Sequence, residues 1–180
     1  WNDPTNTDQT LMRARIRHTI LPFLQEHLGG DVALSLARTA AVAGPDAEYL
    51  DALAATEYTR LKLPAGVHLP DIPGADAAPG DHSTEVAPEK PAPVIIALNR
   101  AETAVLHPAL RMRVLALATR AAQGENPGFE RLQALDEFVA EHATAGPVQL
   151  PGHVSAYRRR RVQDPRTGTR VDALVLISQR

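Results

Sequence analysis

Apolar residues recur every three to four positions near the start of the chain, which is typical of an amphipathic helix. The stripe consists of Met12, Ile16, Ile20 and Phe23. Asp8 is suited to begin this helix, and Pro22 removes a backbone donor and should bend or restart it. Gly29-Gly30 should end it.

A second apolar stripe keeps one helical phase from Val32 to Leu61. Asp31 is suited to cap its start. Because the phase continues through Gly44-Pro45, we expect a single bent helix to about Lys62. Two helices that meet at Gly44-Pro45 are the alternative.

The stretch from Pro64 to Pro93 contains seven prolines among scattered Gly, Asp and Glu. Such a composition cannot bury enough apolar surface to form a packed element. We therefore interpret residues 63–93 as a linker or loop between a helical segment, residues 1–62, and a second region, residues 94–180.

The second region predicts short helices followed by strands. Residues 94–98 predict a strand or the entry to a helix, and Asn99-x-x-Glu102 has the arrangement of a capping box. Further helices are expected from His107-Pro108 to Gly124 and over residues 129–142, and strands over residues 148–150, 154–161 and 171–178. The predicted fold is mainly α: a helical bundle with long bent helices and a small antiparallel sheet at the C-terminus.

Composition narrows the class of protein. The chain of 180 residues has 44% hydrophobic but only 4% aromatic residues, no cysteine and a net charge of −2. A core built from Ala, Leu and Val favours packed helices, and nothing predicts a disulfide or a thiolate metal site. Without a signal peptide or a long apolar run, we expect a cytoplasmic protein that does not enter a membrane. The start at Trp1 suggests a fragment of a longer protein.

A cluster of charged residues surrounds the first helix. The chain reads Asp3-Pro4-Thr5-Asn6-x-Asp8, then Arg13-x-Arg15-Ile16-Arg17-His18, then Leu21-Pro22-x-Leu24. Arg13 and Arg17 lie one turn apart beside the apolar stripe, and two such forks suit a carboxylate or a phosphate. The alternative is that they pair with Asp3 and Asp8 and only lock the turn to the helix. His18 could touch a phosphate or simply lie on the helix surface.

Four consecutive arginines, Arg158, Arg159, Arg160 and Arg161, follow Tyr157 on a predicted strand. Because alternate strand residues face opposite sides, two guanidinium groups could line one face beside an aromatic ring. Such a face suits the RNA backbone or stacked bases. A solvated edge strand protected by charge is the alternative.

No motif predicts a reacting centre in this chain. The seven histidines lack metal-binding spacing, so we expect no metal site, and no glycine-rich loop is available to cradle the phosphates of ATP. No nucleophile elbow is present either. We therefore assign no catalytic residue.

The motif around the first helix resembles the segment of bacterial tRNA(Ile)-lysidine synthetases that follows their PP-loop ATPase domain. That family usually reads D-P-[ST]-N-x-D, R-N-x-[IL]-R and L-P-x-L, and Ala14 replaces the usual Asn here. Leu150-Pro151-Gly152-His153-Val154 with Arg158 also matches the family pattern of the substrate-binding region. The resemblance covers roughly residues 1–62 and 94–162.

The resemblance implies the C-terminal, substrate-binding region of a cytoplasmic ligase that lacks its N-terminal catalytic domain here. Such an enzyme uses ATP and Mg²⁺ to attach L-lysine to the wobble cytidine of tRNA(Ile) with a CAU anticodon. Arg13 and Arg17 would then lie near the junction with the catalytic domain, at its nucleotide pocket or at tRNA phosphate, and Arg158 to Arg161 would be peripheral tRNA contacts. The fragment alone should be inactive. A helical protein-interaction module and a general nucleic-acid-binding domain remain the alternatives.

Overall fold

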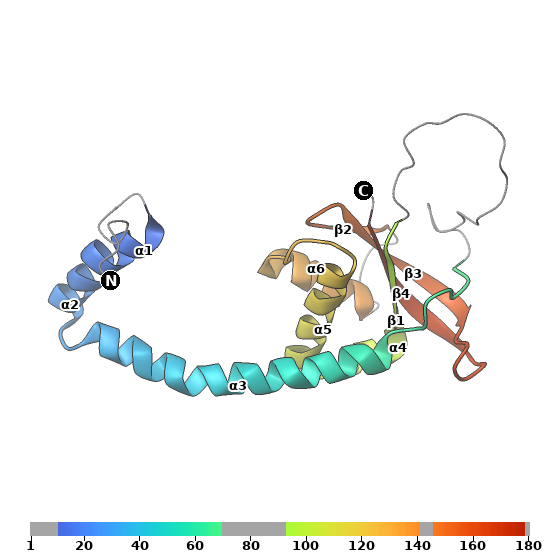
Figure 1. Cartoon of the computed structure of the whole chain (residues 1–180), viewed down its shortest axis with the longest axis horizontal. Coiled ribbons are helices and arrows are strands. Elements are labelled where there is room, and N and C mark those ends of the chain that lie inside the picture. The colour runs from blue at the N-terminus through green and yellow to red at the C-terminus, as the bar shows by residue number, and fades with distance from the viewer. Residues whose placement is uncertain (1–10, 70–92, 141–145, 179–180) are drawn as a thin grey trace, which may run out of the picture. The chain divides into compact units, whose positions relative to one another are not determined.

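The computed structural model describes residues 11–69, 93–140 and 146–178. The chain forms two compact units, residues 1–49 and residues 50–180 (Figure 1). The proline-rich stretch from residue 70 to residue 92 lies outside the described residues, as do the first ten residues. Each unit is considered by itself.

The first unit begins with three helical segments that follow one another directly, α1 (Met12–Arg15), η2 (Ile16–Ile20) and α2 (Leu21–Leu28). The middle segment is a π-helix and ends just before Pro22. Proline has no N–H for the carbonyl four residues earlier, and its ring crowds that carbonyl, so the turn before it widens. The helix therefore changes its hydrogen bonding near Pro22 and ends at Gly29, which has a φ of +68°.

The long helix α3 (Val32–Leu61) is continuous through Pro45, as the unbroken apolar phase predicted. Its start is capped by Asp31, whose carboxylate accepts a hydrogen bond of 2.9 Å from the N–H of Leu34. This cap satisfies one of the backbone donors that the first helical turn leaves unpaired. The alternative of two helices meeting at Gly44-Pro45 is wrong.

The apolar stripe of the first unit is exposed. The exposed fractions of Met12, Ile16, Ile20 and Phe23 are 63%, 41%, 39% and 55%. In α3, Leu36 is also exposed, at 55%, whereas Ala54 and Leu61 near the other end of the helix are fully buried. The stripe has the helical spacing that the sequence predicted, but it does not form a core within this chain.

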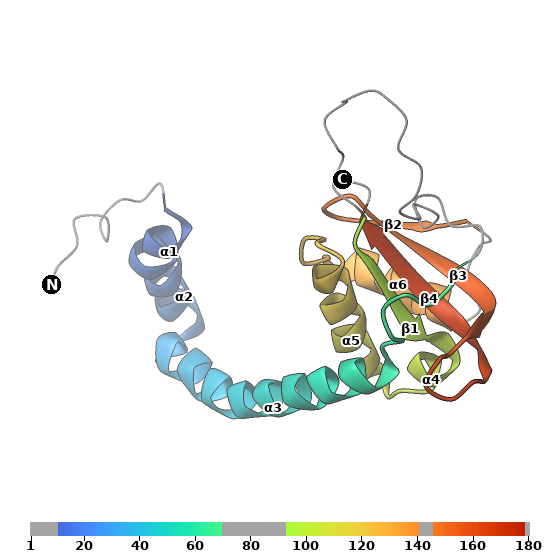
Figure 2. The same ribbon diagram turned by 45° about the vertical axis from the view of Figure 1, so that its right-hand side comes forward.

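The second unit contains a four-stranded antiparallel sheet with strand order β1-β4-β3-β2 (Figure 2). The strands are β1 (Ile95–Asn99), β2 (Val148–Leu150), β3 (Val154–Gln163) and β4 (Arg170–Ser178). The segment that could have been a strand or a helix entry is thus the strand β1, which pairs with β4. The last three strands lie close to the ranges that the sequence predicted.

Helices α4 (Arg100–Ala104), α5 (Pro108–Ala121) and α6 (Phe129–Val139) belong to the same unit. The predicted capping box is present, because the Asn99 side chain accepts a hydrogen bond from the N–H of Glu102 and donates one to its carboxylate. The main core joins α3, the short helices and one face of the sheet, through residues such as Leu61, Val114, Leu135, Phe138, Leu98, Leu174 and Leu176. The fold is mainly α with a small antiparallel sheet, as predicted.

The other face of the sheet carries a second, smaller apolar cluster. Ala173, Val175 and Ile177 of β4 pack there with Leu63 and Leu69, which follow α3. The N–H of Leu63 also donates to the carbonyl of Ala97 at 2.8 Å. The segment after α3 therefore continues the sheet edge at β1 and covers part of this face.

The Leu150-Pro151-Gly152 motif forms the turn between β2 and β3. Gly152 has a φ of +76°, and a Cβ atom there would lie 2.6 Å from the backbone nitrogen of Glu125. The N–H of Glu125 donates to the carbonyl of Pro151 at 3.2 Å. The glycine thus allows the turn to pack directly against the segment between α5 and α6.

Gly152→Ala should destabilise the second unit by about 3 kcal/mol, because it adds a backbone clash to the cost of a left-handed residue with a Cβ. Gly168→Ala is the matched control. Gly168 has a φ of +70° but no atom within 4 Å of an added Cβ, so its loss should be only about 1 kcal/mol. Urea unfolding followed by circular dichroism measures both, and equal losses would show that the close packing of the turn is unimportant.

Candidate nucleic-acid interface

The arginines of the first helix lie on α1 and η2. Arg13 and Arg17 are exposed, and neither makes an ion pair with another residue that the structure describes. His18, on the same helix, is exposed as well. Asp3, Asn6 and Asp8 lie outside the described residues, so the pairing of Arg13 and Arg17 with Asp3 and Asp8 stays a prediction.

Ala14, at the position where the resembling family usually has Asn, is only 6% exposed. Its neighbours in sequence on both sides are exposed. A methyl group needs no hydrogen-bond partner, whereas a buried amide would need one. The substitution is therefore compatible with the buried environment of this position.

The first two arginines of β3 lie on opposite faces of the sheet. Arg158 stacks over the ring of Phe138 from α6, with its guanidinium carbon 4.4 Å from the ring centroid. Arg159 instead lies 5.3 Å from the ring of Tyr157, which packs with the smaller cluster on the other face. Two guanidinium groups beside Tyr157 were expected, so this part of the prediction is wrong.

The alternation fails because β3 contains a bulge. Arg159 pairs with Ala173 and Val162 pairs with Val171, so two arginines stand opposite one residue of β4. Arg160 and Arg161 are both exposed. Neither side chain has an ion pair or a hydrogen bond to any other residue within the described part of the chain. The run thus ends with two guanidinium groups directed to solvent.

Five other arginines of the second unit have carboxylate partners. Arg111 binds Asp136 with two hydrogen bonds, of 2.5 and 2.8 Å, and also donates to the carbonyls of Ala104 and Leu106. This hydrogen bonding raises the pKa of Arg111, despite its partial burial. The remaining pairs are Arg60 with Glu57 and Glu102, Arg100 with Asp172, Arg113 with Asp51, and Arg166 with Asp164. These arginines stabilise the packing of the unit.

Asp164 organises the turn between β3 and β4. Its carboxylate accepts hydrogen bonds from the side chain and the backbone N–H of Arg166. The side-chain hydrogen bonds, followed by the backbone hydrogen bond, lower the pKa of Asp164. Its N–H donates to Thr169, and Gly168 donates to its carbonyl. The arginine strand therefore ends in a closed turn.

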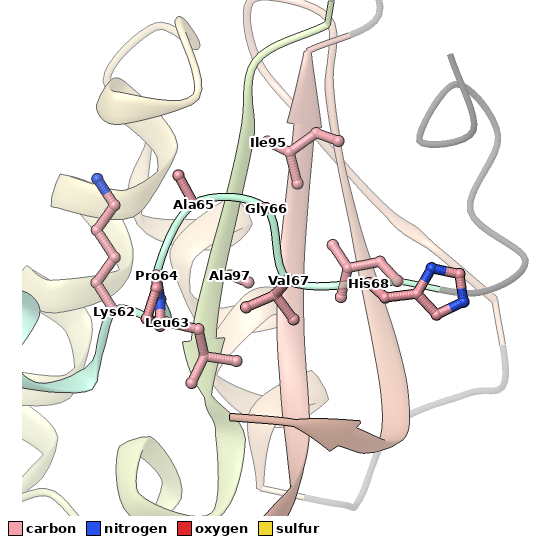
Figure 3. A pocket seen from close by; sticks show the side chains of 10 residues that line it. Lys62, Leu63, Pro64, Ala65, Gly66, Val67, His68, Ile95 and Ala97 are labelled. Atoms are coloured by element: carbon pink, nitrogen blue, oxygen red, sulfur yellow. The ribbon is translucent and has the colours of Figure 1, made fainter. Parts of the chain in front are cut away.

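A cavity of about 390 Å³ lies between the segment after α3 and the edge strand β1 (Figure 3). Its lining is mostly apolar, with Ile95 and Ala97 on the strand. The two basic residues in the lining, Lys62 and His68, lie at opposite ends (Figure 3). The Lys62 ammonium group is 5.9 Å from the ring centroid of Tyr58, whose pKa is raised by burial. Because Lys62 and His68 are the only titratable residues among the described residues of this lining and lie apart, the cavity does not bring a group of catalytic residues together.

Two kinds of feature are missing from the described residues. No group of three or more His, Asp or Glu side chains is arranged to hold a metal ion there. None of the described helices is long and apolar enough to cross a membrane.

Comparison with known proteins shows which family the sequence around these arginines resembles. Residues 98–163 match the family model of the TilS substrate binding domain. This match runs from β1 through β3 and includes all four arginines of the run. Relatives named tRNA(Ile)-lysidine synthase match up to 88% of the chain. The chain belongs to the tRNA(Ile)-lysidine synthase family.

Three of these family members illustrate the extent of the match. The Streptomyces coelicolor relative is 32% identical over 88% of this chain and 37% of its own length. The Leifsonia xyli relative is 30% identical over 84% of this chain and 38% of its own length. The Mycolicibacterium paratuberculosis relative is 44% identical over 43% of this chain and 24% of its own length. This chain thus spans about a quarter to two fifths of these synthases. No solved structure matches it significantly.

Asp172 and Arg100 were not predicted from the sequence as residues of this site. Asp172 stands opposite the bulge and lies 3.6 Å from the guanidinium group of Arg100. Asp172 occurs between apolar residues of a predicted strand, where an isolated acid was a usable signal. Arg100 directly follows the capping asparagine and gave no comparable signal, because its burial depends on the tertiary fold.

Asp164→Asn should destabilise the second unit at neutral pH but not at low pH. A carboxylate whose pKa is lowered by folding stabilises the folded state above its ordinary pKa, and this contribution is lost as the pH falls through the lowered folded value. The difference in unfolding free energy between wild type and Asp164→Asn should therefore shrink below about pH 4. Urea titrations across pH 2.5 to 7 measure it. A difference that does not depend on pH would mean that the carboxylate charge makes no contribution.

Proposed function

We propose that this chain is the tRNA-binding part of a tRNA(Ile)-lysidine synthase. The observation that carries this proposal is the pair of exposed arginines, Arg160 and Arg161, inside the region that matches a substrate binding domain. The relatives are named for a tRNA substrate. Guanidinium groups bind phosphate oxygens in a planar, two-pronged geometry, so an RNA backbone fits this surface.

The contrast among the arginines supports this proposal. Five arginines of the second unit lie against carboxylates of the same unit, whereas Arg160 and Arg161 have no such partner among the described residues. A carboxylate partner largely neutralises the charge of an arginine, which then attracts an anionic ligand only weakly. In the part of the chain that the structure describes, Arg160 and Arg161 therefore place two positive charges without a carboxylate partner next to each other at the bulge of β3.

The proposed parent reaction attaches L-lysine to the wobble cytidine of tRNA(Ile) with a CAU anticodon, using ATP and Mg²⁺. The described residues do not fit ATP with Mg²⁺, because they offer no cluster of carboxylate and histidine ligands and no glycine-rich phosphate loop. We therefore assign ATP, Mg²⁺ and lysine to a catalytic domain of the parent enzyme in the cytoplasm. The share of this chain is to bind and orient the tRNA.

The first unit would contact that catalytic domain. Its apolar stripe is exposed along one helix, and Arg13 lies one turn before Arg17 beside it. An apolar strip flanked by basic groups suits a protein surface with apolar and acidic residues. With His18, these arginines could instead reach tRNA phosphate at the junction.

Two other functions would use the same features differently. A helical protein-interaction module would use the exposed stripe and would not bind RNA. A general nucleic-acid-binding domain would bind RNA through the arginines of β3 without preferring one tRNA. The exposed stripe supports the first alternative, and the four-arginine run supports the second.

Titration of the 180-residue chain with tRNA(Ile) at several salt concentrations tests the proposal. Neutralisation of about four phosphates predicts a slope of log affinity against log salt of roughly −3 to −4. The double variant Arg160→Ala/Arg161→Ala should weaken binding and reduce the steepness of this slope by about two, since each lost phosphate contact reduces it by about one.

Arg120→Ala is the matched control. It removes one positive charge from an exposed side chain in the last turn of α5, where Arg120 only donates to the side chain of Asn126 at 3.3 Å. It should leave the slope nearly unchanged. If the wild type shows no salt-dependent binding to tRNA, the interaction module is supported. If it binds an elongator tRNA(Met) as tightly as tRNA(Ile), with an equally steep dependence on salt, the general binder is supported.

A further inference from the structure

The bulge of β3 holds Arg161 in an unusual backbone conformation. Arg160 and Arg161 together stand opposite the single residue Asp172. Arg161 has a φ of +56°, in the left-handed region that favours glycine. A side chain with a Cβ costs free energy there, and such a conformation persists only where the surroundings hold it.

Asp172 makes a direct contact with the backbone of this residue. Its Oδ1 atom accepts a hydrogen bond of 3.3 Å from the backbone N–H of Arg161. The two residues face one another across β3 and β4, so the carboxylate reaches the bulge without leaving its strand. The hydrogen bond stabilises the left-handed residue and ties the bulge to the centre of the sheet.

Arg100 forms an ion pair with Asp172. The Nη2 atom of Arg100 lies 3.6 Å from Oδ2 of Asp172, and the exposed fraction of the Arg100 side chain is only 10%. Its Nη1 atom donates to the carbonyl of Val139 at 2.8 Å. Because Val139 ends α6 and Arg100 begins α4, two helix ends anchor the arginine. A nearly buried guanidinium anchored in this way restricts the carboxylate beside it.

We infer that Asp172 is a positioning residue for RNA binding, which orients Arg160 and Arg161 by holding the bulge, with Arg100 as its anchor. This inference rests on the proposed function. It assigns a favourable role in binding a polyanion to a negatively charged residue close to the binding surface. Simple electrostatics predicts the opposite, because a carboxylate near a phosphate site repels the phosphate.

Asp172→Ala therefore gives a test in which the two accounts differ in sign. If Asp172 positions the bulge, the variant should bind tRNA(Ile) about tenfold more weakly, with a salt slope less steep by about one because a phosphate contact is lost. If Asp172 contributes only its charge, the variant should bind more tightly, with a slope that is unchanged or steeper. Fluorescence anisotropy with labelled tRNA measures both quantities.

Asp172→Glu keeps the charge beside Arg100 and displaces the hydrogen-bond acceptor by one methylene. It should fold as the wild type does and still lose affinity, so it decides the question if Asp172→Ala is unfolded at the assay temperature. Glu130→Ala is the matched control, because it removes one exposed carboxylate from the first turn of α6. It should bind tRNA as well as or better than the wild type.

The outcomes separate this inference from the proposed function. If the wild type binds no tRNA, the proposed function fails and the inference fails with it. If the wild type binds and both Asp172 variants bind at least as tightly, the inference alone is overturned. Weaker binding by folded Asp172→Glu, with Glu130→Ala unaffected, supports the positioning role.

Discussion

The pairing of β4 with strands on both of its sides is the interaction on which the second unit depends. β4 pairs with β3 along most of its length and with β1 on the other side. Leu174 and Leu176 face the main core, Ala173 and Val175 face the smaller cluster, and all four are fully buried. A strand buried on both faces fixes the register of its neighbours, because a slip of one residue would exchange the two faces. That register therefore determines which face of the sheet each arginine of β3 occupies.

The distribution of charge follows from this core. Arginines that lie against helices or turns need an anion nearby, because an unpaired charge that is removed from water is costly. Arg111 shows this most clearly: its side chain is 14% exposed, and Asp136 and two carbonyls satisfy its donors. Arg160 and Arg161 can do without such partners because they are exposed. Arg60 and Arg166 are exposed and still have carboxylate partners, so the presence of a partner, and not burial alone, distinguishes the arginines that stabilise the fold from Arg160 and Arg161.

Local sequence signals predicted several of the helix starts and most of the strands, but not the start of α1, which follows Leu11 without a side-chain cap. The caps at Asp31 and Asn99, the stop at Gly29 and the turn at Pro151-Gly152 depend on groups close in sequence, so their chemistry could be read directly. The pairing of β1 with β4 joins residues about 80 positions apart, and no local pattern reveals it. The π-helix before Pro22 was also missed, since a proline can break, bend or widen a helix.

The sequence predicted that the four arginines of β3 form the candidate site, but it did not predict which face of the sheet each of them occupies. Strict alternation would place Arg161 on the face of Tyr157 and Arg159, but the extra residue of the bulge gives that place to Val162, which is buried in the smaller cluster. The sequence signal for this change was Asp172, an acid opposite a basic run, and its meaning depends on the register of β4.

Energetics also explain how an arginine can occupy a position suited to glycine. A left-handed residue with a Cβ costs about 1–2 kcal/mol, and the hydrogen bond from its N–H to Asp172 contributes about 1 kcal/mol. The bulge is therefore nearly neutral for stability once Asp172 is in place. Because folding then depends little on the side chain at this position, its guanidinium group remains free to serve binding. The hydrogen bond to Asp172 offsets the strain of the left-handed backbone at Arg161. The guanidinium group of Arg161 can therefore be directed toward a ligand with little loss of stability.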